Sequence, residues 1–178
     1  PIVIKDAELD VNARLDQFIA TTENFFDIFD IELVASISDK AFAFEKSMVI
    51  TESVAEKMYG SVSPLGRTLT SDEFEGTITA VIKDIPRTAT FGAELIINSG
   101  AEDFRLSRSC NDGKCWFTTP HFIVLNQSVN SVQFAEKVNH SIKDVSSNVD
   151  SLAFEKIEDI YLSKLQIKDS QKKGNSKV

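Results

Sequence analysis

Residues 48–69, MVITESVAEKMYGSVSPLGRTL, constrain the fold more than any other stretch of the chain. This signature segment begins with a short apolar run that is typical of a buried strand. A pattern of helical period follows and stops at Gly60, and Pro64 prevents the helix from resuming. Leu65 and Gly66 then make a turn into a second apolar run. The signature segment therefore predicts a strand, a short helix, a turn and a second strand in one unit.

The start of this helix has two solutions. Thr51 can cap it directly, or Ser53 caps it while Glu56 reaches back in a capping box. Either start places Val54, Ala55 and Met58 on one face, and we expect that apolar face to be buried. The opposite face carries the charged side chains, which are Glu52, Glu56 and Lys57.

Length and charge limit the class of protein. A chain of 178 residues with 42% hydrophobic content can bury a core of its own. The net charge is −8 and the basic residues are scattered, so we expect no nucleic-acid partner. The longest apolar runs, such as residues 122–125, are far shorter than the ~20 residues that span a bilayer.

Apolar alternation predicts further strands on both sides of the signature segment. They lie at residues 2–4, 14–21, 74–84, 93–98 and 121–126. The polar residues 5–12 are predicted as a turn, so the first two strands can pair as neighbours. We expect Ile78, Ala80 and Ile82 to lie on one face of their strand.

Two more helices are predicted. Asn24 can cap a short helix that gathers three rings on one side, namely Phe25, Phe26 and Phe29. Core packing is the favoured role for these rings over a ligand pocket. Ser131 begins the longest helix, with an apolar stripe that should pack across a sheet: Phe134, Val138, Ile142 and Val145.

These patterns predict an α+β fold with mixed and antiparallel sheets, a few packed helices and two lobes. A β-α-β lobe would combine residues 1–23 with 119–165, and residues 24–118 would form a smaller inserted β-rich lobe. Residues 166–178 lose apolar periodicity and are predicted as a solvated, flexible tail.

The sequence offers little for catalysis. His121 and His140 are the only histidines; one opens a predicted strand and the other lies on the polar side of the predicted long helix, where a lone histidine is more often structural or solvated than a catalytic base. The chain has no G-x-G-x-x-G motif and no phosphate loop. Residues 72–76 cluster carboxylates but lack the staggered ligands of a calcium loop, and they are predicted as a hairpin tip. We therefore expect no enzyme activity, no cofactor and no metal site.

Four segments occur in order along the chain. The first, third and fourth are NFFDIF at residues 24–29, TAVIKDIP at 79–86 and IEDIYLS at 157–163. The second has the pattern V-I-[TS]-E-S-x-A-x-K-x-[YF]-G-x-x-x-P-[LI]-G-[RK]-x-L, carried by Val49, Ile50, Thr51, Glu52, Ser53, Ala55, Lys57, Tyr59, Gly60, Pro64, Leu65, Gly66, Arg67 and Leu69. Together they resemble the MacB-type periplasmic core domain of FtsX-like ABC transporter permeases, with Ala80 where that family often has glycine.

This resemblance implies that residues 1–178 are a single extracytoplasmic domain at the periplasmic face of the bacterial inner membrane. The domain would transmit ATP-driven conformational change for export or envelope work. Its implied partners are its own transmembrane helices, one of them after the tail, a second permease copy, a cytoplasmic ABC ATPase and an envelope protein or lipoprotein. The alternative is a free-standing secreted or periplasmic binding domain for a peptide, lipid or carbohydrate, using a groove beside the Phe-rich segments.

Cys110 and Cys115 are the only cysteines, and the residues between them, Asn-Asp-Gly-Lys, include a strong tight-turn dipeptide. Their sulfurs could face each other across a hairpin mouth, and a disulfide there would stabilise the fold by about 2 kcal/mol. Two free thiols in a reducing cytosol are the alternative. The resemblance to a periplasmic family favours the disulfide, and we expect no zinc site.

Overall fold

The computed structural model describes residues 1–72, 74–86, 89, 91–100, 122–145, 152–157 and 159, and within them all side chains except those of residues 143–145. Residues 1–118 and 119–178 form two compact units, here called the first and second unit, and each is considered by itself. The first unit contains the signature segment within a mixed sheet, and the second contains one long helix. These elements confirm the predicted α+β class.

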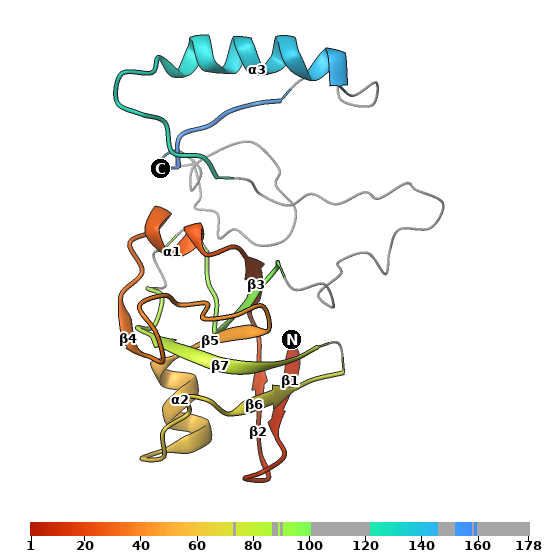
Figure 1. The fold of residues 1–178 in the computed structure, drawn as a ribbon, viewed down its shortest axis with the longest axis vertical. Coiled ribbons are helices and arrows are strands. Elements are labelled where there is room, and N and C mark those ends of the chain that lie inside the picture. Colours follow the sequence, from red (N-terminus) through yellow and green to blue (C-terminus); the bar gives the residue numbers. More distant parts are fainter. Residues whose placement is uncertain are drawn as a thin grey trace, which may run out of the picture. The chain divides into compact units, whose positions relative to one another are not determined.

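A mixed sheet forms the body of the first unit (Figure 1). Its strands are β1 (Ile2–Asp6), β2 (Val11–Leu15), β3 (Phe18–Thr21), β4 (Leu33–Ser36), β5 (Ser47–Thr51), β6 (Thr68–Thr70), β7 (Glu75–Ile82) and β8 (Leu95–Asn98). Within the described residues their order is β2-β1-β6-β7-β5-β8-β3, and β4 also pairs with β7. The β5–β7 and β3–β8 pairs are parallel, and the other pairs are antiparallel.

Two helices flank this sheet, α1 (Asn24–Ile28) and α2 (Glu52–Tyr59). Side chains of β5 alternate between two buried clusters, because Val49 packs with the residues of α1 and Ile50 packs with those of α2. The two helices therefore cover opposite faces of β5, as Figure 1 shows. All five residues of β5 are buried, which confirms the strand predicted at residues 48–50.

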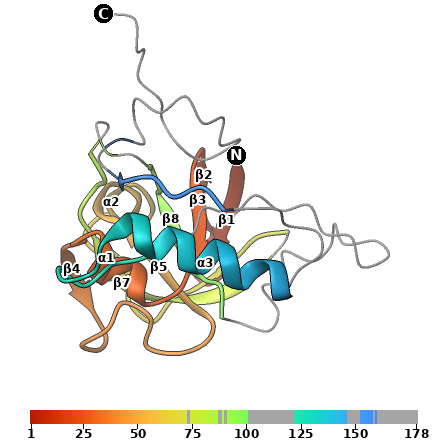
Figure 2. The ribbon, with the colours of Figure 1, turned by 90° about the horizontal axis from the view of Figure 1, so that it is seen from above.

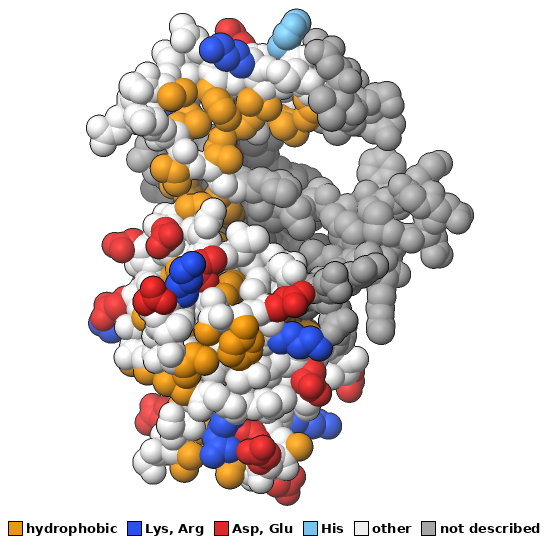
Figure 3. Space-filling view, in the orientation of Figure 1, with side chains coloured by type: hydrophobic (Ala, Val, Ile, Leu, Met, Phe, Trp, Pro, Cys, Tyr) orange, Lys and Arg blue, Asp and Glu red, His pale blue; other side chains and the backbone are white. Residues whose placement is uncertain are grey.

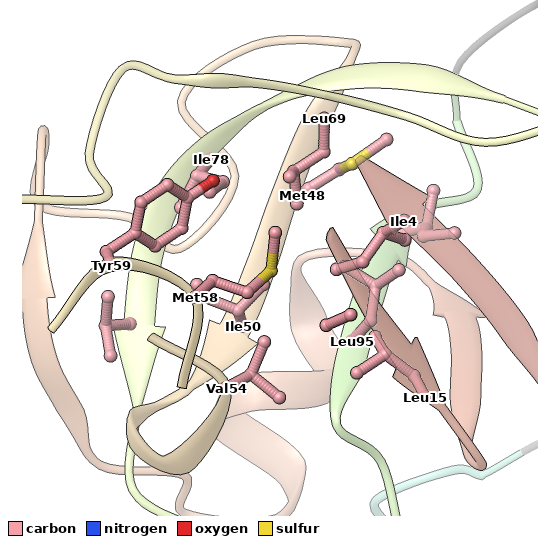
Figure 4. Packing of buried hydrophobic residues seen from close by; sticks show 13 residues of the cluster. Ile4, Leu15, Met48, Ile50, Val54, Met58, Tyr59, Leu69, Ile78 and Leu95 are labelled. Atoms are coloured by element: carbon pink, nitrogen blue, oxygen red, sulfur yellow. The ribbon is translucent and has the colours of Figure 1, made fainter. Parts of the chain in front are cut away.

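The aliphatic cluster lies on the α2 face (Figure 4). Its buried members are Ile4, Ala13, Leu15, Met48, Ile50, Val54, Met58, Tyr59, Leu69, Ile78, Val81, Leu95 and Ile97. The aromatic cluster lies on the α1 face and consists of Phe25, Phe26, Ala41, Phe42, Val49, Ala80, Ile82, Ala93 and Ile96. This confirms core packing for Phe25 and Phe26, and the third predicted ring, Phe29, is partly buried and packs against the cluster.

The segment predicted as one strand at residues 14–21 is two strands instead. Its first part ends β2, which pairs with β1 as predicted, and its second part is β3, which pairs with β8. The break falls at Asp16 and Gln17, whose N–H groups donate to a Glu94 carboxylate oxygen at 2.6 and 3.1 Å. These amides bind a side chain in place of a strand partner, so the ladder is interrupted.

The turn predicted over residues 5–12 is also shorter, because β1 and β2 extend into it and leave only residues 7–10. Asp10 has a φ of 53°, in the left-handed region that aspartate tolerates in turns. The Asp6 side chain closes the turn, since its Oδ1 accepts from the N–H groups of Glu8 at 3.0 Å and Leu9 at 3.2 Å.

A bulge in β7 contradicts the prediction that Ile78, Ala80 and Ile82 share one face. Ile78 lies in the aliphatic cluster, whereas Ala80 and Ile82 lie in the aromatic cluster. The register against β5 shifts by one residue at Thr79, which exchanges the two faces of the strand. Thr79 is fully buried, and its hydroxyl donates to the carbonyl oxygen of Ala41 at 2.6 Å.

The start of α1 also differs in detail from its prediction. Glu23 occupies the N-cap position, and Asn24 is the first helical residue. The Glu23 carboxylate does not cap the helix but accepts from the backbone N–H groups of Ala41 at 3.2 Å and Phe42 at 2.9 Å. The charged side chain thus fixes the loop that carries Phe42 into the aromatic cluster.

The second unit contains α3 (Ser131–Val145), which Figure 2 shows lengthwise and which begins where the sequence predicts. Asn130 caps this helix by accepting from the N–H groups of Val132 and Gln133. The Phe134 ring lies 5.6 Å from the Phe154 ring, edge to face. Packing of the apolar stripe across a sheet stays a prediction.

The strand predicted at residues 121–126 is wrong for the described residues 122–126, which contain no strand, and the later strand of the predicted β-α-β lobe stays a prediction. Leu152 is tied to α3, because the Asn139 side chain binds both its N–H and its carbonyl oxygen, at 2.6 and 2.9 Å. In the first unit, β1 to β3 share the sheet with β4 to β8. The predicted grouping of residues 1–23 with 119–165 stays a prediction, and the tail at 166–178 lies outside the described residues.

Candidate functional site

The signature segment folds as predicted and presents α2 to the sheet. Val54 and Met58 are 3% and 6% exposed, which confirms the buried face. The helix ends at Gly60, which has a φ of 57° and donates its N–H to the carbonyl oxygen of Glu56 at 2.9 Å. The charged side chains predicted to point outward are exposed: Glu52, Glu56 and Lys57.

The N-terminal end of α2 is held by a residue that lies just beyond the end of β7. Thr51 occupies the N-cap position but makes no side-chain cap, and Ser53 lies inside the helix, so both predicted caps are wrong. Asp84 supplies the contact instead, since its Oδ1 accepts from the N–H of Ser53 at 3.1 Å and its Oδ2 accepts from the Ser53 hydroxyl. A carboxylate at a helix N-terminus also meets the positive end of the helix dipole.

Strand register explains this contact. β5 and β7 are parallel neighbours, and Thr51 lies opposite Ile82. Ser53 and Asp84 each follow two residues later, so both emerge at the same edge of the sheet. The contact joins two of the four segments noted in the sequence, residues 49–69 and 79–86.

The C-terminal end of α2 leads into a turn that is tied to β7. Gly66 has a φ of 81°, and its N–H donates to the carbonyl oxygen of Ile78 at 2.8 Å. The N–H of Ile78 donates in return to the carbonyl oxygen of Arg67 at 2.9 Å. This exchange fixes the backbone of the turn at residues 60–66 against the bulged strand.

Four residues form a polar cluster beside this turn: Asp6, Glu8, Tyr59 and Arg67. Asp6 is 1% exposed, and its Oδ2 lies 3.6 Å from Nη1 of Arg67. The same Nη1 lies 3.7 Å from Oε2 of Glu8. The Arg67 guanidinium carbon lies 5.8 Å from the centre of the Tyr59 ring, and Arg67 Nε donates to the carbonyl oxygen of Ser63 at 3.2 Å.

Burial, and then the nearby Asp6 carboxylate, raise the pKa of Tyr59 well above its usual range, while Arg67 acts in the opposite direction. Tyr59 therefore stays neutral throughout the physiological pH range. The Tyr59 hydroxyl and Asp6 Oδ2 have no hydrogen-bond partner of ordinary geometry among the described residues. Asp6 Oδ1 accepts from two backbone N–H groups, and Arg67 is the positive charge that faces Asp6 Oδ2.

The other residues considered in the sequence stand as follows. Cys110, Cys115 and His121 lie outside the described residues, so the disulfide stays a prediction. His140 is exposed on α3. At the acidic hairpin tip, the N–H of Ser71 donates to the carbonyl oxygen of Phe74 at 2.9 Å, which confirms a turn. Across the parts of the chain that the structure describes, no group of three or more His, Cys, Asp or Glu side chains is placed to hold a metal ion.

Acidic and basic side chains are interspersed over the visible face of the first unit (Figure 3).

Sequence reasoning missed Asp6 and Asp84, the two carboxylates that contact the signature segment. Asp84 had a signal, because it belongs to the segment at residues 79–86. Asp6 had none, because it lies in a polar stretch that was predicted as a turn.

Comparison with known proteins places this geometry in context. A family model described as the MacB-like periplasmic core domain matches residues 3–142. A domain of a candidate permease protein from Porphyromonas gingivalis has a TM-score of 0.54 and 23% identity, with 72% of this chain and 58% of that chain covered. The periplasmic region of MacB from Actinobacillus actinomycetemcomitans has a TM-score of 0.51 and 14% identity, with 81% and 62% covered.

The chain therefore spans about three fifths of each of these two solved structures, and at such identities the likeness concerns the fold alone. No curated protein gives a significant match. Among the helices in the described residues, none combines the length and apolar character needed to cross a membrane.

Proposed function

Because the chain belongs to the MacB-like periplasmic core domain family, we propose that it is the extracytoplasmic domain of an ABC transporter permease and transmits ATP-driven conformational change for export or envelope work. On this proposal the membrane-spanning helices belong to the longer polypeptide that carries the chain. ATP hydrolysis takes place on a cytoplasmic ABC ATPase, a second permease copy completes the transporter, and an envelope protein or lipoprotein is a further partner. The chain itself catalyses no reaction.

The observation that carries this proposal is the way the signature segment is fixed. Its strand is buried on both faces, the start of its helix contacts Asp84 beyond the end of β7, and Arg67 after the helix faces Asp6 of β1. Packed interiors transmit displacement instead of absorbing it, because they are nearly incompressible. The matched positions in this segment thus serve the fold of a rigid body, and none is assigned to bind a substrate.

Cell-surface labelling tests where the domain resides. Lys57 is exposed on α2, so Lys57→Cys in the full-length protein offers a single reactive thiol once Cys110, Cys115 and any cysteine elsewhere in that protein are replaced by serine. We expect a membrane-impermeant maleimide to label this cysteine in spheroplasts without lysis. The matched control is the same background without Lys57→Cys. Labelling that appears only after lysis would contradict the proposed location.

Coupling to ATP is tested on the purified transporter. The full-length permease and its ATPase subunit are reconstituted in nanodiscs, with a fluorophore at Lys57→Cys. The proposal predicts that the emission changes on adding ATP and magnesium and returns when the ATP is consumed. An ATPase subunit that cannot hydrolyse ATP provides the control. A signal that does not respond to ATP, in a transporter that hydrolyses it, would contradict the proposed coupling.

A further inference from the structure

The β1–β2 hairpin is well paired within itself but has a narrow connection to the rest of the sheet. β1 and β2 share five register pairs, from Ile2 opposite Leu15 to Asp6 opposite Val11. Between β1 and β6 the register contains one pair, Lys5 opposite Thr70. By contrast, β5 and β7 share five pairs at the centre of the sheet. Strand pairing with β6 therefore holds the hairpin weakly, and the Glu94 carboxylate contacts the chain only beyond the hairpin, at Asp16 and Gln17.

Apolar packing contributes to this junction, but it is not directional. Ile4 and Leu15 of the hairpin are fully buried in the aliphatic cluster, where they meet the side chains of α2. Burial of this kind stabilises contact between the hairpin and the helix without fixing one relative angle. A directional contact is needed to select one orientation.

The polar cluster supplies such a contact next to the single backbone pair. Asp6 follows Lys5 directly, and its carboxylate faces Arg67, which directly precedes β6. Arg67 is itself oriented by the Ser63 carbonyl oxygen and by the Tyr59 ring. A planar guanidinium held on two sides has one preferred direction, which a lysine could not reproduce.

We propose that Asp6 is a positioning residue that locks the β1–β2 hairpin in one orientation against the signature segment, through its charge contact with Arg67. The lock makes the hairpin, α2 and the turn at residues 60–66 move as one body. Its mechanical consequence rests on the proposed function, in which the domain transmits conformational change. The lock itself is a property of the chain and needs no membrane.

Hydrogen exchange of the 178-residue chain tests the lock. Asp6→Asn keeps the Oδ1 acceptor for the N–H groups of Glu8 and Leu9 and removes the charge that faces Arg67. We expect amide exchange in residues 2–15 and 60–66 to rise by about tenfold, and exchange in β5 and β7 to stay unchanged. Lys83→Gln, which removes an exposed ion pair with Glu32, is the control and should leave the exchange rates in these two segments unchanged.

Variants at Arg67 keep the test decisive if Asp6→Asn fails to fold. Arg67→Gln should reproduce the exchange pattern of Asp6→Asn, and the double variant should add nothing to either single change. Arg67→Lys should restore protection only in part. Exchange that rises equally in every strand, or additive effects in the double variant, would overturn the lock.

A distance measurement gives a second, independent readout. Spin labels at Asn12→Cys in β2 and Lys57→Cys in α2, both exposed positions, report the angle between hairpin and helix once Cys110 and Cys115 are replaced by serine. We expect one narrow distance distribution for the parent chain and a broader one for Asp6→Asn. Equal widths would overturn the lock. Failure of the labelling assay in cells would instead contradict the proposed function and leave this result intact.

Discussion

The two faces of the central sheet hold their helices in different ways. On one face the five-residue helix α1 is fixed by rings outside the helix, with centroids 5.0 Å apart for Phe25 and Phe91 and 5.1 Å apart for Phe26 and Phe42. On the other face the eight-residue helix α2 packs on aliphatic side chains and is fixed at its ends by Asp84 and Arg67. Edge-to-face rings have a preferred geometry, whereas aliphatic side chains do not. Polar contacts therefore supply orientation where the packing cannot.

The largest expected effects come from truncation at the centre of each face. Phe26→Ala should lower the free energy of unfolding by about 3–5 kcal/mol and Ile50→Ala by about 2–5 kcal/mol, because both side chains are buried and leave cavities. Urea denaturation measures both. The exposed Val3→Ala serves as the control and should change the free energy by less than about 0.5 kcal/mol.

Conservative changes then sharpen the comparison. Phe26→Leu loses edge-to-face contacts of about 0.5–1.5 kcal/mol each, so it should cost more than Met58→Leu on the aliphatic face. If Met58→Leu proves as costly as Phe26→Leu, the proposed difference between the faces is wrong.

A close backbone approach provides the next prediction. A Cβ at Gly76 would lie 2.6 Å from both the carbonyl oxygen of Lys46 and Cε of Met48. The methionine can move but the carbonyl cannot, so Gly76→Ala should destabilise the fold by about 1–3 kcal/mol. Thermal unfolding detects this loss, with the exposed Ser61→Ala as the control. A variant as stable as the parent chain would show that β5 and β7 tolerate separation at this point.

Loss of the Asp84 contact at the start of α2 should lower the free energy of unfolding moderately. Asp84→Ala removes the only side-chain acceptor that the structure shows for the N–H of Ser53 among the described residues, and should cost about 0.5–2 kcal/mol. Asp84→Asn keeps an acceptor and should cost less. Urea denaturation compares them with Asp72→Ala, at an exposed position of the β6–β7 turn. Equal stability of Asp84→Ala and the parent chain would rule out the cap.

Tyr59→Phe should change the free energy of unfolding least at neutral pH, and in alkali it should change how that free energy depends on pH. Its raised pKa means that the folded chain holds the phenolic proton more tightly than the unfolded chain does. The resulting stability is complete below the unfolded pKa of about 10 and is lost as the pH rises above that value. Denaturation from pH 9 to pH 11.5 should show a steeper loss for the parent chain than for Tyr59→Phe. Parallel slopes would contradict the burial of this hydroxyl beside Asp6.

Local patterns predicted the signature segment well, because each of its structural features depends on residues that are close in sequence. The apolar run of β5, the buried face of Val54 and Met58 and the stop at Gly60 all follow from spacing or from glycine chemistry. The errors arose where a distant residue decided the outcome. Asp84 replaced the local caps of α2, and Glu94 divided the strand predicted at residues 14–21.

The candidate site was predictable only in part for the same reason. Tyr59 and Arg67 belong to the recognised pattern, but nothing in the sequence indicates that they meet Asp6, more than fifty residues away. The shift at Thr79 was equally hidden, since a bulge leaves no mark on an apolar alternation. Both features depend on which distant residues and strands pair, and a single sequence does not reveal those pairings.

The central claim is that the first unit moves as one rigid body in a transporter, and electron paramagnetic resonance can test it directly. The full-length permease with its ATPase subunit would carry spin labels at Asp27→Cys in α1 and Lys57→Cys in α2, both exposed, with Cys110 and Cys115 replaced by serine. ATP should leave the distance between these two labels within one copy unchanged, while the distance between Lys57→Cys labels in two copies changes. A change within the copy, with no change between copies, would contradict the account.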